Sequence, residues 1–250
     1  MRSTLRTALS WTGLVVMALS LVWLESLPKI ERPIQARRTA PPNLFPMVVL
    51  DPGHGGQDTG AMCGGMLEKD LTLDVAQRLD RRLRAAGLST LMTRGGDNYI
   101  SLAERAAMTN RVQDCILVSI HFNDADKPVS TGIETYYAER QIGGGTLLAS
   151  WLPFLRRISA DTPNLESQSL AGFIQNSLVS RTQAVNRGTK TQQFFVLANV
   201  RHPAVLVEGG FISNKDDANK LGSASYREEI AAAMSEGILQ YRDVLKGGKR

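Results

Sequence analysis

The 250-residue sequence is poor in cysteine, histidine and aromatic residues. Its two cysteines, Cys63 and Cys115, cannot form the disulfide framework of a small secreted scaffold, although a single bridge between them is left open. Its three histidines, His54, His121 and His202, are few enough for each to be weighed as a ligand. Internal repeats and low-complexity tracts are absent, and the composition, 43% hydrophobic and 21% charged, is ordinary for a globular protein. The sequence therefore excludes disordered, collagen-like and multi-span membrane proteins.

Positive charge is in small excess and is unevenly distributed. The chain has 29 Lys and Arg residues against 24 Asp and Glu, a net charge of +5. Most of this excess lies before residue 47, and residues 246–250 form a short basic tail. The rest of the sequence is close to neutral, whereas a nucleic-acid-binding domain needs a basic stripe on its folded surface. We therefore expect no nucleic-acid partner.

The first 24 residues have the pattern of an export signal. Arg2 and Arg6 precede an uncharged, largely apolar run at 7–24, which predicts an N-terminal hydrophobic helix. The run is long for a cleaved signal peptide and at the short limit for a membrane span. The sequence alone does not decide between a cleaved signal and a retained signal anchor, and a buried core helix is a weaker alternative. In either exported form the remaining chain reaches the periplasm or the outer face of the cytoplasmic membrane, and residues 7–24 are a candidate membrane tether.

Five prolines make residues 25–46 a Pro-rich linker, and the sequence from 47 to 245 then alternates short apolar runs with segments of helical periodicity. This alternation predicts a single α/β domain with a mostly parallel twisted sheet that is flanked by helices on both faces. The expected strands are 47–50, 88–93, 115–120, 132–138, 194–197 and 205–207. The expected helices are 71–86, 101–110, 143–159, 165–182 and 226–245.

Chemically competent side chains follow several of these strands. His54, His121 and Glu208 each come at the end of an apolar run, and Glu68 starts a helix. Because sites in parallel sheets form at the carboxyl ends of strands, these side chains are expected near one another. Two imidazoles and one carboxylate make a common catalytic zinc shell, and a buried Glu208 is suited to a general base. Structural roles for each residue, such as a satisfied core histidine or a carboxylate paired with arginine, are the alternatives at this point.

Six segments, in order, resemble the zinc-dependent N-acetylmuramoyl-L-alanine amidases of the amidase 3 family, which are cell-wall hydrolases. They are VVLDPGHGG at 48–56, EKDLTL at 68–73, LMTR at 91–94, LVSIHFN at 117–123, NRGTK at 186–190 and VLVEGGFISN at 205–214. The resemblance implies that His54, Glu68 and His121 bind one zinc ion and that Glu208 is the catalytic glutamate. It also implies hydrolysis of the amide between N-acetylmuramic acid and L-alanine of the peptidoglycan stem peptide, in the cell envelope.

Several roles remain alternatives on sequence alone. A wall-binding or regulatory module without turnover, and a zinc peptidase that cuts within the stem peptide, compete with the amidase. Asn123 is a candidate substrate contact because it follows His121 by two residues. Glu134 and Arg105 are interpreted as structural, and His202 and Cys63 as loop residues rather than ligands. A protein activator and the biological role of the enzyme are left open.

Overall fold

The computed structural model describes residues 45–127, 129–141 and 164–247. The expected hydrophobic helix at 7–24, nearly all of the linker at 25–46 and the expected helix at 143–159 lie outside these residues. The described residues all belong to one compact unit. Among the residues that the structure describes, no helix has the length and apolar character needed to cross a membrane.

A six-stranded sheet forms the centre of the domain, with the strand order β4-β1-β5-β8-β6-β7. All neighbouring strands are parallel except β6, which runs antiparallel to β8, so the predicted mostly parallel sheet is confirmed. The apolar runs predicted the central strands because parallel strands are buried on both faces. The strands are β4 (Ser89–Met92), β1 (Met47–Pro52), β5 (Cys115–Asn123), β8 (Ala204–Phe211), β6 (Ile133–Tyr137) and β7 (Asn186–Thr191).

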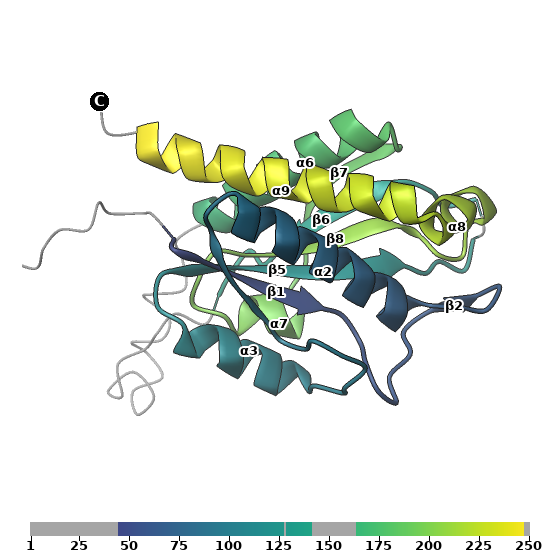
Figure 1. The fold of residues 1–250 in the computed structure, drawn as a ribbon, viewed down its shortest axis with the longest axis horizontal. Helices are drawn as coiled ribbons and strands as arrows, with labels where there is room; N and C mark the ends of the chain where they lie inside the picture. Colours follow the sequence, from purple (N-terminus) through teal and green to yellow (C-terminus); the bar gives the residue numbers. More distant parts are fainter. Residues whose placement is uncertain (1–44, 128, 142–163, 248–250) are drawn as a thin grey trace, which may run out of the picture. The chain divides into compact units, whose positions relative to one another are not determined.

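Helices cover both faces of the sheet (Figure 1). One face packs against α2 (Glu68–Ala85), α6 (Leu165–Thr182) and α9 (Ala224–Gly247), and these helices share the larger hydrophobic core with β5 and β8. The opposite face packs against α3 (Leu102–Arg111) and the single-turn helix α7 (Phe195–Ala198) in a smaller core. A short helix, α8 (Lys215–Gly222), follows β8. The sheet is therefore the middle of three layers, as the sequence predicted.

The start of α3 was also predictable from side-chain chemistry. Ser101 accepts a hydrogen bond from the backbone N–H of Glu104, and the Glu104 side chain accepts one from the backbone N–H of Ser101. This reciprocal capping box satisfies amide groups that have no partner within the helix. The pattern Ser-x-x-Glu thus fixes where the helix begins.

Two features of the fold differ from expectation. Residues 194–197 do not form a strand: Phe195 to Ala198 are helical and bury Val196 and Leu197 in the smaller core. A short apolar run fits a buried strand and a buried helical turn equally well, so periodicity could not separate the two. Within the six-stranded sheet, the strand that was not predicted is β7, an edge strand made of polar residues and glycine.

The loop between β1 and α2 contains a small two-stranded hairpin, β2 (Met62–Cys63) with β3 (Met66–Leu67). It was not predicted, because two-residue strands carry no periodic signal. Cys63 lies in this hairpin and Cys115 starts β5, and both are free thiols. The disulfide bridge that the sequence left open is therefore not formed.

Candidate metal centre and active site

Two buried arginines hold the loop that carries His54. Arg105 of α3 donates hydrogen bonds to Asp51 Oδ1 at 2.7 Å and to the carbonyl oxygens of Pro52 and His54 at 2.6 and 2.7 Å. Arg94, which follows β4, donates to the same Pro52 carbonyl at 3.0 Å. These bonds satisfy backbone acceptors that would otherwise be buried without partners. The loop geometry therefore depends on side chains from distant parts of the sequence.

Close packing brings the two histidines together. A Cβ atom at Gly53 would lie 2.2 Å from His121 Cε1, so only glycine fits between the loop and the ring. His54 has a φ of +59°, in the left-handed region that residues other than glycine rarely adopt. The two imidazole rings meet edge to face with their centroids 4.9 Å apart.

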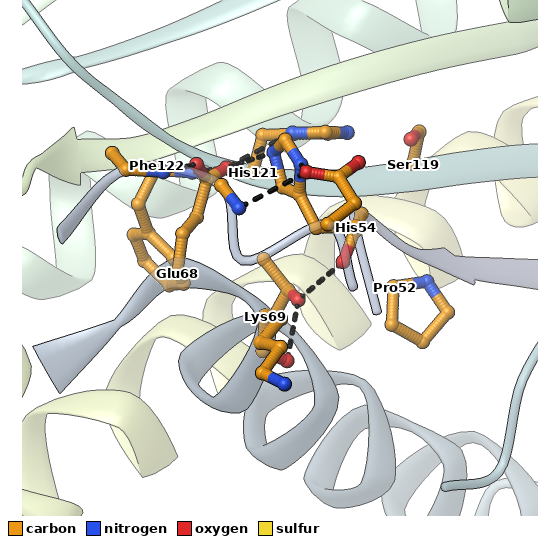
Figure 2. Close-up of polar contacts among 12 residues, drawn as sticks. Pro52, His54, Glu68, Lys69, Ser119, His121 and Phe122 are labelled. Carbon is orange, nitrogen blue, oxygen red and sulfur yellow. Dashed lines mark hydrogen bonds and ion pairs between the residues drawn. The ribbon is translucent and has the colours of Figure 1, made fainter. Parts of the chain in front are cut away.

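The carboxylate of Glu68 contacts both rings (Figure 2). Its Oε1 is 3.0 Å from His54 Nε2 and 3.0 Å from His121 Nδ1, and it also accepts the backbone N–H of Phe122 at 3.1 Å. Burial raises the pKa of Glu68, but the hydrogen bonds from both histidines outweigh burial and hold the pKa well below its usual range. Its place as the first residue of α2 also favours negative charge. Glu68 is therefore a carboxylate at neutral pH.

Asp58 fixes the orientation of the His54 ring. Its Oδ1 lies 2.8 Å from His54 Nδ1, which leaves Nε2 facing Glu68. Carboxylates commonly orient metal-binding histidines in this way. Burial lowers the pKa of His54, but the two carboxylates outweigh burial and raise it. Asp58 was not predicted as a site residue, because a loop residue four positions after a histidine carries no periodic signal.

His54, Glu68 and His121 form a candidate site for one metal ion. Their ligand atoms lie within 4.8 Å of one another, and the donor set of two imidazole nitrogens and one carboxylate oxygen fits a divalent ion such as zinc. Across residues 45–127, 129–141 and 164–247, no other group of three His, Cys, Asp or Glu side chains is gathered in this way. His202 and Cys63, which were interpreted from the sequence as loop residues rather than ligands, are not part of the cluster.

Glu208 lies on β8 directly opposite His121 of β5. Its Oε2 is buried and has no hydrogen-bond partner among the described residues. Burial raises the pKa of Glu208 well above its ordinary value, and the negative charges of Glu68 and Glu134 raise it further. Buried polar atoms without a partner are rare, and this oxygen is free to exchange a proton with a ligand.

The neighbouring strand β6 adds a second buried carboxylate, Glu134, opposite Glu208. The Asn123 side chain donates a hydrogen bond to it at 2.8 Å, and Arg187 and Lys190 of β7 also donate to it. The amide nitrogen of Asn123 therefore binds protein, and the predicted substrate contact of this residue stays a prediction. Both cations belong to NRGTK at 186–190, one of the six segments of the family resemblance, but no role was predicted for them because their strand has no alternation of apolar residues.

Known proteins resemble this chain over almost the whole described domain. The sequence profile of a family described as N-acetylmuramoyl-L-alanine amidase matches residues 48–240. An uncharacterized Bacillus subtilis protein, YqiI, is 36% identical over 196 residues, which cover 78% of this chain and 84% of YqiI. The N-acetylmuramoyl-L-alanine amidase AmiA of Escherichia coli is 29% identical over 219 residues, covering 78% of this chain and 75% of AmiA. Among solved structures, the N-acetylmuramoyl-L-alanine amidase from Clostridium difficile 630 has a TM-score of 0.67 at 31% identity, covering 80% of this chain and 98% of that one.

Proposed function

Because the chain belongs to the N-acetylmuramoyl-L-alanine amidase family, we propose that it uses one zinc ion to hydrolyse the amide between N-acetylmuramic acid and L-alanine in the stem peptide of bacterial peptidoglycan. The observation that carries this function is the cluster of His54, Glu68 and His121 beside the unpartnered carboxylate oxygen of Glu208. A ligand set and a free proton acceptor on neighbouring strands are the two parts that metal-assisted hydrolysis of an amide requires.

Each residue has a distinct role in this proposal. His54 and His121 each offer one ring nitrogen and Glu68 offers one carboxylate oxygen, while Asp58 keeps the His54 ring turned toward the ion. Zinc bound there would supply a Lewis acid for the amide carbonyl and would lower the pKa of the attacking water. Glu208 accepts the proton of that water on its free oxygen and returns it to the leaving amine. The proton therefore moves between water, Glu208 and the amine without net consumption.

The location of the substrate bears on the N-terminal segment. Peptidoglycan lies outside the cytoplasmic membrane, so an enzyme that acts on it must be exported. The basic start and apolar run at 1–24 fit an export signal or anchor, and the linker at 25–46 would then separate the catalytic domain from the membrane. We propose periplasmic or surface-exposed action, with or without a retained tether.

Digestion of purified peptidoglycan tests the function. The zinc-loaded chain is incubated with peptidoglycan, with and without a chelator, and the soluble fragments are identified by mass. We expect free stem peptides that begin with L-alanine, released only when zinc is present. Cleavage within the stem would identify a peptidase instead, and binding without release would identify a wall-binding module.

Two substitutions assign the residues. Glu208→Gln is expected to keep zinc and lose turnover, because the amide cannot accept the proton, whereas His54→Ala is expected to lose both. Glu236→Gln provides the matched control, since that glutamate is exposed on α9 and pairs with Arg181. Full activity of Glu208→Gln would exclude the role given to its carboxylate.

A further inference from the structure

The carboxylate of Glu134 gathers an unusual number of donors. Its residue is 1% exposed, and Oε1 accepts hydrogen bonds from Asn123 Nδ2 at 2.8 Å and from the Tyr136 hydroxyl at 2.6 Å. Oε2 accepts from Arg187 Nε at 2.8 Å and from Lys190 Nζ. Glu134 is thus fully satisfied, and it acts as an anchor for two cations from the edge strand.

The two cations exceed the charge that anchors them. Arg187 and Lys190 bring two positive charges to one carboxylate, and their side chains are 33% and 39% exposed. Arg187 uses only Nε for Glu134, and within the described part of the chain its two terminal nitrogens donate no hydrogen bond. Its guanidinium lies over the Phe211 ring, with Cζ 4.8 Å from the ring centroid, and this contact is a second restraint on the side chain beside the bond to Glu134. The arrangement leaves a preoriented donor pair and a net positive charge open to a ligand.

This cluster belongs to the same row of residues as the candidate catalytic centre. His121, Glu208 and Glu134 lie opposite one another on the adjacent strands β5, β8 and β6. Because neighbouring strands are about 4.8 Å apart, Glu134 lies roughly 10 Å from His121 across the sheet. The cations come from β7, the next strand beyond β6, and their head groups bond Glu134, so these groups lie about two strand spacings from His121 and beyond the proposed general base.

The chemistry of the substrate suggests what these cations bind. In the proposed substrate the sugar is uncharged, and its lactyl carboxyl group is consumed in the scissile amide. Negative charge therefore lies on the stem peptide, which extends by about 3.3–3.6 Å per residue. The second residue is reached after about 7 Å, and its carboxylate comes within reach of the long side chains of β7.

We propose that Arg187 and Lys190, positioned by Glu134, form an anion subsite that binds a free carboxylate on the second residue of the stem peptide. The terminal nitrogens of Arg187 match a carboxylate in bidentate geometry, and Lys190 adds a point charge. This subsite rests on the proposed function, because its ligand is part of the amidase substrate.

A pair of matched compounds tests the subsite by binding. They are N-acetylmuramoyl-L-alanyl-γ-D-glutamyl-L-lysine amide and its D-isoglutamine counterpart, which differ only in a carboxylate replaced by a carboxamide. Binding is measured calorimetrically with the zinc-loaded Glu208→Gln chain, so that no turnover interferes. We expect the carboxylate compound to bind at least about tenfold more tightly, as one charge-assisted bidentate contact provides.

Substitutions in the same background separate a ligand contact from a structural ion pair. Arg187→Gln is expected to abolish the preference for the carboxylate compound, while the dissociation constant of the carboxamide compound changes by less than about twofold. Lys190→Gln is expected to reduce this preference without abolishing it. Arg181→Gln removes an equal charge from α6, where Arg181 pairs with Glu236, and should keep the full preference. Equal binding of the two compounds by the Glu208→Gln chain, or equal weakening of both by Arg187→Gln, would overturn the subsite.

Turnover by the wild-type chain distinguishes this inference from the proposed function. The same preference is expected in kcat/KM, mainly through KM, because the contact is remote from the reacting bond. Release of L-alanyl peptides from both compounds at equal rates refutes the subsite and supports the amidase. Selective binding without any release refutes the amidase and supports the subsite.

Discussion

Removal of the Arg105 side chain is expected to destabilise the whole domain, because it leaves a buried charge without its partner. The side chains of Arg105 and Asp51 are 4% and 1% exposed and are joined at 2.7 Å. In Arg105→Met, Asp51 keeps only the hydroxyl donors of Thr93 at 2.6 Å and Ser119 at 2.8 Å. Breaking one side of a buried ion pair costs about 3–5 kcal/mol, and with two donors left we expect about 3 kcal/mol.

Urea unfolding at pH 7, followed by circular dichroism, measures this change. A loss of about 3 kcal/mol in a domain of this size corresponds to a melting temperature lower by roughly 6–12 °C. Zinc binding should weaken as well, because Arg105 also donates to the His54 carbonyl. Arg84→Met is the matched control: Arg84 is 59% exposed in its pair with Asp80, so the loss should stay below about 1 kcal/mol.

A second substitution tests the reason for the loss. Asp51→Asn combined with Arg105→Met removes the stranded charge, so the double variant should be more stable than Arg105→Met alone. An unfolding free energy of Arg105→Met within about 1 kcal/mol of wild type would refute the reasoning, since even the lower bound for a broken buried pair is larger.

Three further predictions follow from single features of the structure. Gly53→Ala should lower the amount of bound zinc and the activity, because the new Cβ would lie 2.2 Å from the His121 ring. Gly96→Ala is the control, since a Cβ there would have no atom within 4 Å. Equal zinc content in the two variants would contradict the packing argument. Burial raises the pKa of Asp74, but hydrogen bonds from Arg78 and Arg227 outweigh burial, so the pKa in the folded chain is lowered. The ionised carboxylate therefore stabilises the fold above about pH 4, and this stabilisation is lost as the pH falls further. Asp74→Asn should therefore reduce the acid sensitivity of the urea midpoint between pH 7 and 3, and an unchanged pH profile would exclude this role. Burial raises the pKa of the Cys115 thiol to about 12, so iodoacetamide at pH 8 should label Cys63 but not Cys115 in the native chain. Labelling is read by peptide mass, and comparable labelling of both cysteines would contradict this prediction.

The parts of the fold that could be predicted are those whose sequence pattern has a local cause. β1 and β5 are continuous apolar runs, and α3 begins at the Ser-x-x-Glu box. The candidate metal ligands were predictable for a related reason: parallel strands end at one edge of the sheet, so the side chains near the ends of β1 and β5 meet there. The resemblance to a known family favoured a metal-binding role for them over a structural one.

The remaining features depend on contacts that a local pattern does not encode. β7 is a strand because it pairs with β6, not because its own residues alternate. Residues 194–197 were wrongly predicted as a strand. Their apolar side chains reflect burial in the smaller core, and burial does not tell a strand from a helical turn. The roles of Asp58 and of the Glu134 cluster are defined by side-chain contacts. Two of these contacts, from Arg187 and Lys190 to Glu134, join residues 53 and 56 positions apart, and the resemblance of the segment NRGTK did not show which side chain they contact.

The polar edge strand β7 also affects how the molecule meets other copies of itself. An exposed sheet edge presents unpaired backbone groups on which another chain can add a strand, and charged side chains discourage such pairing. β7 lies at one end of the sheet and carries Arg187 and Lys190 among small polar residues. The residues proposed to select the substrate thus also protect the domain from edge-to-edge aggregation. Apolar replacements there are therefore expected to change solubility and specificity together.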